Sequence, residues 1–145
     1  MTAKSAEEIL GLEFDWLASD GDGRVALFTT AGGGYAPERF LRHTEAHEKA
    51  IDAILGLPTS TAARFAPQLD EGHQNTWAAV AERGLFAFDS DFNGGPYRLV
   101  AAPVVPVLSV ALPRAVAEVV SLVVFMHLKF SDLTEVPKEL LFERR

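Results

Sequence analysis

The chain has 145 residues, of which 48% are hydrophobic and 23% are charged, as expected for a single folded domain spanning residues 1–145. Its formal net charge of -7 disfavours binding to nucleic acid or anionic membranes and suits a basic protein partner. The absence of cysteine excludes disulfides, thiolate metal ligands and a cysteine nucleophile.

Neither a secretory signal nor a membrane-spanning helix is predicted. The N-terminal residues MTAKSAEEILGLEF contain no uninterrupted apolar run. The most apolar stretch, residues 99–128, is interrupted by prolines and contains the charged residues Arg114 and Glu118. No window within it supplies the roughly 20 uncharged residues that a spanning helix requires. We therefore expect a cytoplasmic protein.

The clearest pattern in the sequence is a β-hairpin over residues 14–30, FDWLASDGDGRVALFTT. Trp16 and the residues two positions away share one face of the first strand, and residues 25–28 alternate in the same way. The DGDG turn at residues 20–23 has the composition of a tight hairpin turn. A hairpin alone is barely stable in water, so later segments must add strands and a covering layer. We expect Trp16 to be buried.

Residues 38–55 predict the clearest helix, with Pro37 near its first turn and Gly56 at its end. One apolar stripe of this helix is expected to pack on the sheet: Phe40, Thr44, His47, Ile51 and Ile54. The three glycines at 32–34 precede the helix. They predict a flexible connection rather than a phosphate loop, because neither the Walker nor the dinucleotide pattern is complete.

The middle of the chain predicts a loop, a helix and a second hairpin. Residues 59–72 are polar, with one helical turn expected near 62–65, and residues 73–83 predict a helix that stops at Gly84. A second hairpin is then expected, in which the strands 85–89 and 97–101 flank a glycine-rich turn.

The C-terminal third is more ambiguous. Two prolines predict an extended connection or an edge strand around 104–110. Residues 119–125 fit either a helix or a buried strand, and we favour a helix to Leu122 followed by a strand through residues 129–131. The tail is polar from Asp132. The predicted fold is α+β, with an antiparallel sheet of two hairpins plus one or two further strands, packed against two or three helices.

His43 and His47 lie four residues apart on the predicted helix, a spacing that lets both imidazoles reach one metal ion. However, the HExxH pattern is incomplete, and His73 is only a remote candidate for a third ligand. We expect His47 at the edge of the core and His43 in solvent. The turn at 20–23 begins like a calcium loop, but Ala31 replaces the required glutamate. The sequence thus predicts no metal and no other cofactor.

Asp89, Asp91, Tyr97 and Arg98 are the candidate partner-binding residues. Asp89 and Asp91 are expected on one side of a single strand, and the following turn can bring Tyr97 or Arg98 close to them. Two such carboxylates can hold a cation or share a proton, or can simply form a solvated face. Aromatic residues and arginine surrounded by charges are typical of protein-binding hot spots.

Two passages, residues 14–37 and 86–106, contain the motifs D-W-L-A, T-A-G and G-P-Y-R. With these motifs the chain resembles a group of small uncharacterised bacterial proteins, which are similar in kind to the immunity proteins of bacterial toxin systems. Immunity proteins are small, acidic α+β inhibitors. The resemblance covers about a third of the chain and includes no catalytic motif, so no functional residue is carried over from it.

The leading hypothesis is therefore a noncatalytic protein-binding module, with an immunity-type toxin inhibitor as one form of it. The alternative is a small enzyme or metal-binding protein that uses His43 and His47. A structural or oligomeric protein without a ligand is a third interpretation. The chain has no Gly-x-Ser-x-Gly motif of a hydrolase and no RNP-like motif or basic patch of a nucleic-acid-binding protein.

Overall fold

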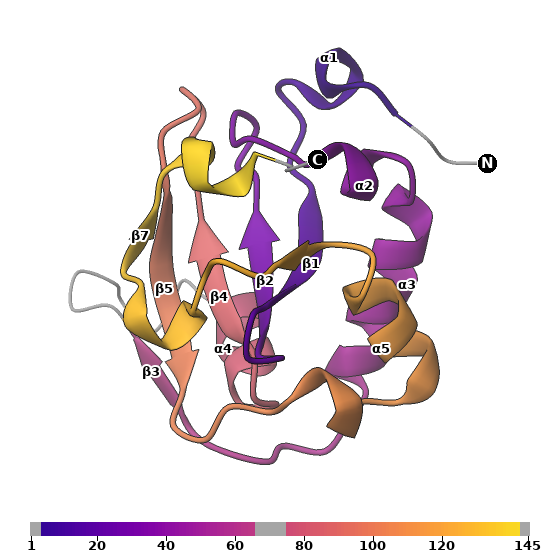
Figure 1. Cartoon of the computed structure of the whole chain (residues 1–145), viewed down its shortest axis with the longest axis vertical. Coiled ribbons are helices and arrows are strands. Elements are labelled where there is room, and N and C mark those ends of the chain that lie inside the picture. Colours follow the sequence, from indigo (N-terminus) through magenta and orange to yellow (C-terminus); the bar gives the residue numbers. More distant parts are fainter. Residues whose placement is uncertain (1–3, 66–74, 143–145) are drawn as a thin grey trace.

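The computed structural model describes residues 4–65 and 75–142. These residues form a central β-sheet with helices packed around it (Figure 1). The elements in chain order are α1 (Ala6–Ile9), β1 (Asp15–Asp20), β2 (Val25–Thr29), α2 (Glu38–Leu41), α3 (Thr44–Leu55), β3 (Ala63–Phe65), α4 (Asn75–Ala81), β4 (Phe86–Asp89), β5 (Tyr97–Pro103), η2 (Ser109–Ala111), α5 (Arg114–Val120), β6 (Val124–Phe125), η3 (Phe130–Asp132), β7 (Glu135–Val136) and η4 (Lys138–Leu141). The strand order is β3-β5-β4-β2-β1-β6, and β7 pairs with β5 outside this path.

The β1–β2 hairpin predicted from the sequence is confirmed. Its strands are antiparallel from the Asp15–Thr29 pair to the Ser19–Val25 pair. Every residue of β2 and all but the first residue of β1 are buried. Side chains that alternate along these strands therefore enter two different cores rather than one core and solvent. Trp16 has 0% of its surface exposed, as expected.

The turn of this hairpin is held by the buried carboxylate of Asp20. Its Oδ1 accepts hydrogen bonds from the backbone N–H groups of Asp22 and Arg24. Its Oδ2 accepts a hydrogen bond from the N–H of Phe130, at 2.8 Å. The same side chain thus closes the turn and attaches the C-terminal segment, which is a structural role for the residue that begins the calcium-like pattern.

The sheet is mixed, so the predicted antiparallel sheet is wrong, although the α+β class is confirmed. The β4–β5 hairpin forms as expected, but it joins the first hairpin through parallel pairing of β2 with β4. β6 is also parallel to β1. The connection over residues 30–85 contains helices and is long enough to place β4 parallel to β2. The described ranges contain five α-helices rather than two or three.

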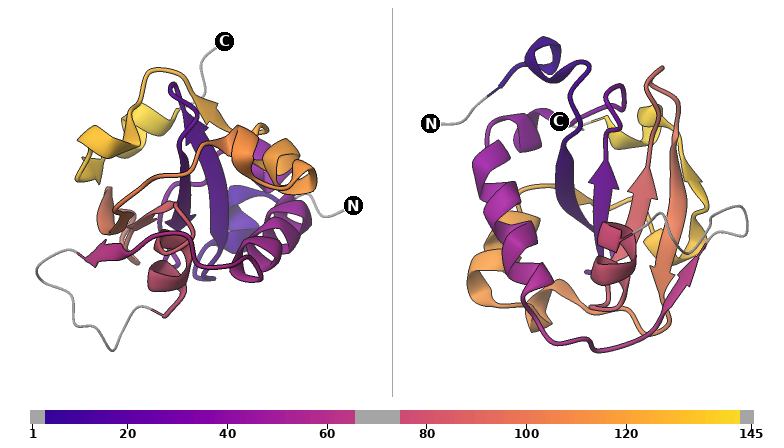
Figure 2. Two further views of the ribbon diagram at one scale, coloured as in Figure 1. Left: turned by 90° about the horizontal axis from the view of Figure 1, so that it is seen from below. Right: turned by 180° about the vertical axis from the view of Figure 1, so that it is seen from behind.

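Two hydrophobic cores lie on opposite faces of the sheet. One core is rich in aromatic residues, including Trp16, Phe28, Phe40, Phe86, Phe88, Tyr97, Phe125 and Phe130. The C-terminal segment crosses this face, whereas α3, α4 and α5 contribute to the other, aliphatic core (Figures 1 and 2). We call these the aromatic face and the helix face.

The predicted helix over residues 38–55 is divided into α2 and α3. His43, with φ -138° and ψ 39°, lies outside the helical region and separates them. The division has a packing reason, because Phe40 belongs to the aromatic core whereas Ile51 and Ile54 belong to the aliphatic core. The predicted apolar stripe is nevertheless buried along its full length.

Other expected elements are partly corrected. The helical turn predicted near 62–65 is instead the strand β3, which pairs with β5. The predicted helix over 73–83 is present as α4, and Gly84 ends it with a positive φ of 96°. The beginning of that prediction, with His73, lies outside the described residues.

The C-terminal segment contains more structure than its sequence predicted. Helix α5 ends at Val120 rather than at Leu122, and β6 has only two residues. The strand expected after Leu122 and through residues 129–131 is therefore present only as β6, and the 3-10 helix η3 lies where that strand was expected to end. The polar tail forms β7 and η4, whose Val136 and Leu141 are fully buried in the aromatic core. Residues 104–110 form no strand, although Leu108 forms an isolated β-bridge with Arg24.

Candidate functional site

Three neighbouring strands bring polar side chains together at one end of the sheet. Asp15 pairs with Thr29, and Thr29 pairs with Asp89, so the three residues form a row across β1, β2 and β4. Each lies two positions from a residue of the aliphatic core, which places the row on the helix face. The parallel strands β2 and β4 both end here, and the carboxyl ends of parallel strands are common ligand-binding positions.

Hydrogen bonds fix this row. The Trp77 indole Nε1, on α4, donates to Thr29 Oγ1 at 3.3 Å. The Thr29 hydroxyl is in turn hydrogen-bonded to the carboxylate of Asp15. A helix residue thus holds a central strand residue, which in turn orients an acidic group.

A cleft of about 470 Å³ opens between this end of the sheet and α3. Its lining residues are Glu13, Phe14, Asp15, Thr44, Glu48, Ile51, Asp52, Leu55 and Thr76. Four of them are acidic, and three have large apolar side chains. We call this feature, together with the neighbouring Asp89, the acidic cleft.

The electrostatic environment raises the pKa of two carboxyl groups at the cleft. Burial raises the pKa of Asp15, and the charge of Glu13 adds to this effect. The pKa of Asp89 is raised to about 6. The largest cause is burial, and the charges of Glu13 and Asp15 add smaller effects. Negative charge accumulated at a partly desolvated position favours the entry of a cation or a proton.

The carboxylates of the acidic cleft are not neutralised by neighbouring basic side chains of the described residues. Within the described part of the chain, no ion pair is formed by Glu13, Asp15, Glu48, Asp52 or Asp89. Elsewhere, five acidic residues each lie within 4.0 Å of an arginine nitrogen: Asp22, Glu38, Asp91, Glu118 and Glu135. The carboxylates of the cleft thus keep their charge unneutralised.

The predicted placement of Asp89 and Asp91 on one strand is wrong, because β4 ends at Asp89. The Asp91 carboxylate accepts hydrogen bonds from the N–H groups of Asn93 and Gly95, both at 2.9 Å, and so forms the next turn. These bonds, that of Gly95 first, lower the pKa of Asp91, whereas the pKa of Asp89 is raised. The two carboxylates therefore have different environments.

Tyr97 and Arg98 are separated in the same way. Tyr97 is 1% exposed; its hydroxyl accepts a hydrogen bond from Trp16 Nε1 and donates one to the Tyr35 carbonyl. Arg98 is exposed and lies 3.9 Å from Asp91 and 3.5 Å from Glu135. Of the four predicted partner-binding residues, Asp91 and Arg98 share a surface, Asp89 adjoins the acidic cleft, and Tyr97 belongs to the core.

The histidine pair does not form a common site. His43 is exposed, whereas His47 is fully buried and its Nδ1 accepts a hydrogen bond from the N–H of Leu17. Among residues 4–65 and 75–142, no three His, Asp or Glu side chains are arranged so that they could hold one metal ion. His73 lies outside these ranges.

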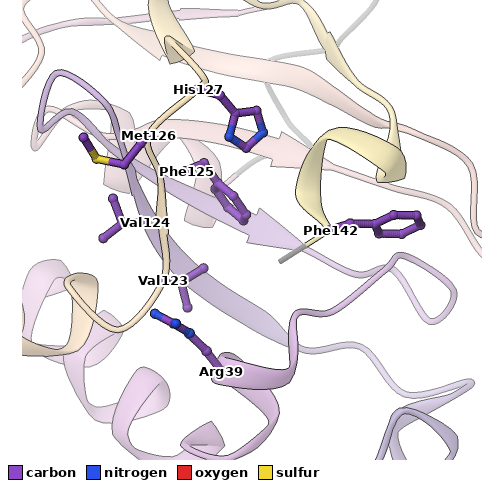
Figure 3. Close-up of a pocket in the computed structure, with 7 residues that line it drawn as sticks. All are labelled: Arg39, Val123, Val124, Phe125, Met126, His127 and Phe142. Carbon is purple, nitrogen blue, oxygen red and sulfur yellow. The ribbon is translucent and has the colours of Figure 1, made fainter. Parts of the chain in front are cut away.

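Two smaller cavities lie elsewhere. One, of about 290 Å³, is lined in part by Gly32, Gly33 and Gly34. These glycines have a packing role, because a Cβ at Gly33 would meet the carbonyl of Phe92. The other, of about 210 Å³, lies beside β6 at the sheet edge and is lined by Arg39, Val123, Val124, Phe125, Met126, His127 and Phe142 (Figure 3).

Sequence reasoning missed most residues of the acidic cleft. Glu48 and Asp52 lie four positions apart on the predicted helix, which is a signal that they share one face. Asp15 begins a strand that is otherwise buried. Neither signal shows that β1 and α3 place these carboxylates around one cleft, because that depends on how the helix crosses the sheet.

The fold is thus an α+β mixed sheet with an acidic cleft at one end. Comparisons with protein-family models, with characterised proteins and with solved structures found no match. In the described part of the chain, the longest and most apolar helices fall short of the length and hydropathy that crossing a membrane requires.

Proposed function

We propose that the chain is a noncatalytic protein-binding module whose acidic cleft receives a lysine or arginine side chain of a basic partner. The observation that carries this proposal is the set of five carboxylates without an ion pair, two of them with raised pKa values. Holding such charges together is unfavourable for the folded chain alone, and a bound cation relieves the repulsion.

The lining of the cleft fits the two chemical parts of such a side chain. Phe14, Ile51 and Leu55 offer apolar surface to an aliphatic stem, and the surrounding carboxylates accept hydrogen bonds from its charged end. Charge-assisted hydrogen bonds of this kind are stronger than neutral ones. A basic partner would also be steered by the net charge of -7, so association should slow as salt increases.

The surface of Asp91 and Arg98, which the sequence predicted as partner-binding, is a weaker candidate for contact with a basic partner than the acidic cleft. Asp91 and Arg98 already interact with each other, which leaves them less negative charge to offer than the cleft. An immunity-type inhibitor, which covers the active face of a toxin, is one protein of the proposed kind.

A direct test uses a short peptide of lysine and alanine and, as its control, the same peptide with acetylated lysines. We expect the lysine peptide to give saturable NMR shifts at the amides of Asp15, Thr44 and Asp52. The shifts should be lost in Asp15→Asn/Asp52→Asn and kept in Asp91→Asn. Shifts spread evenly over all acidic residues, or their absence, would contradict the proposal. The same variants then test any partner captured from the native host.

The raised pKa of Asp89 supports a second candidate function, that of a small enzyme in which this carboxyl acts as a general acid or base. A substrate screen decides between the two. The enzyme interpretation requires a turnover that depends on a group with a pKa near 6 and that is abolished by Asp89→Asn.

A further inference from the structure

The imidazole of His47 occupies an unusual position between α3 and β1. The side chain is fully buried, and its Nδ1 accepts the hydrogen bond of the Leu17 N–H at 3.0 Å. Its other nitrogen, Nε2, has no hydrogen-bond partner among residues 4–65 and 75–142. The nearest ring is that of Phe40 on α2, which stands perpendicular to the imidazole with its centroid 5.0 Å away.

The hydrogen bond from the Leu17 N–H to His47 takes the place of a hydrogen bond to a neighbouring strand. β6 pairs with β1 only at Ser19 and Asp20, so on that side the rest of β1 has no strand beside it. The chain fills this gap with α3, and His47 supplies the acceptor that the buried Leu17 N–H requires. The imidazole is thus a direct polar link between the helix and the sheet.

This link is formed only by the neutral imidazole. To accept at Nδ1, the ring must carry its proton on Nε2. A second proton would turn Nδ1 into a donor facing another donor, and would place a charge in a fully buried position with no partner at Nε2. Protonation is therefore incompatible with the observed contact between α3 and β1.

The surrounding charges do not compensate. Helix α3 itself carries Glu45, Glu48, Lys49 and Asp52. The elements packed against it carry Asp15 and Asp20 on β1, Glu38 and Arg39 on α2, and Arg114 and Glu118 on α5, whereas α4 carries no charged residue. Burial lowers the pKa of His47 to about 4, and the charge of His43 adds to this effect.

We propose that His47 is an acid-sensitive latch that holds α3 against β1 and so sets the shape of the acidic cleft. Thr44, Glu48 and Asp52, on the same helix, form one wall of the cleft. Protonation releases the helix from Leu17 and disorganises that wall. The latch itself rests on the His47 contacts, while its role as a regulator of partner binding rests on the function proposed above.

Amide hydrogen exchange tests the latch without any ligand. Wild type is compared with His47→Asn, which keeps an acceptor near the position of Nδ1 but does not titrate, and with His43→Gln, which removes the exposed imidazole. The measured quantity is the protection of the Leu17 amide in wild type divided by that in His47→Asn, after correction for intrinsic exchange rates. We expect this ratio to fall roughly 20-fold between pH 7 and pH 5. This is the change implied by a His47 pKa of about 6.5 in the unfolded chain and about 4 in the folded chain. His43→Gln should retain most of this fall.

An NMR titration of the His47 imidazole in the wild-type protein tests the latch even if the His47→Asn variant does not fold. We expect His47 to stay neutral, with its proton on Nε2, down to about pH 5. Titration near pH 6.5, or equal pH dependence of Leu17 protection in wild type and His47→Asn, would overturn the latch. Because the folded imidazole takes up its proton only near pH 4, a larger loss of lysine-peptide binding between pH 7 and pH 4 in wild type than in His47→Asn would support regulation. Equal losses in wild type and His47→Asn would overturn the regulation and leave the proposed function intact, whereas failure to bind at pH 7 refutes the function alone.

Discussion

The two faces of the sheet use their buried residues differently. On the aromatic face, Trp16 stacks on Phe28 with ring centroids 4.2 Å apart, and its indole N–H is bonded to Tyr97. On the helix face, the aliphatic core ends at carboxylates without ion pairs, and α3 brings a buried imidazole with an unpartnered nitrogen. The first face concentrates stability. The second retains carboxyl groups whose ionisation reduces stability, and this is where we place the function.

The largest effect is expected on the aromatic face. Trp16→Ala removes a fully buried side chain that contacts Phe28, Phe40, Tyr97 and Phe125, so it should reduce the free energy of unfolding by about 3–5 kcal/mol. Urea unfolding followed by circular dichroism measures the loss. The half-buried Trp77 provides the matched comparison, and Trp77→Ala should cost less. A Trp16→Ala loss no larger than that of Trp77→Ala would remove the distinction between the two faces.

The second effect is acid destabilisation through His47. Because its pKa is lowered from 6.5 to about 4 in the folded state, the unfolded chain takes up the proton more readily. The contribution of His47 to stability is therefore present above pH 6.5 and lost as pH falls towards 4, by roughly 3 kcal/mol. Unfolding midpoints measured at several pH values should show this loss in wild type. A loss of the same size in His47→Asn would assign it to other groups.

The third effect has the opposite sign. The pKa of Asp89 is raised to about 6, so its ionisation at neutral pH destabilises the folded chain. Asp89→Asn should be more stable than wild type at pH 7.5 by roughly 1 kcal/mol, a value reduced because the side chain is partly exposed. The advantage should shrink as pH falls through 6 and disappear below about 4. Urea unfolding at pH 7.5 and pH 4.5 checks this, and a variant less stable than wild type at pH 7.5 would show that the charge is favourable.

The smallest effect is expected at Asp91, which sharpens the contrast between neighbouring carboxylates. Its pKa is lowered, first by the N–H of Gly95, so its charge favours folding at neutral pH. Asp91→Asn should be slightly less stable than wild type at pH 7.5, and the difference should vanish as pH falls through the range in which Asp91 protonates. Thermal melting of Asp89→Asn and Asp91→Asn side by side gives the comparison. Shifts of the same sign at pH 7.5 would contradict it.

Local sequence patterns are sufficient to predict most of the individual helices and hairpins. Alternation around Trp16 and a DGDG turn predict the first hairpin, and the glycine turn before Tyr97 predicts the second, because turn residues and side-chain periodicity act over a few neighbouring residues. The pattern of residues 38–55 likewise predicts a helix and its buried stripe. It does not reveal the break at His43, which arises because Phe40 and Ile51 pack into different cores.

The arrangement of these elements relative to one another depends on long-range packing. The parallel pairing of β2 with β4 depends on the path of the long connection between the hairpins, for which local sequence carries no signal. That pairing places Asp89 beside Thr29 and Asp15, and the crossing of α3 adds Glu48 and Asp52. The acidic cleft therefore consists of residues far apart in the chain. Their common position is set by non-local strand pairing and core packing, whereas periodicity is a local property of each segment.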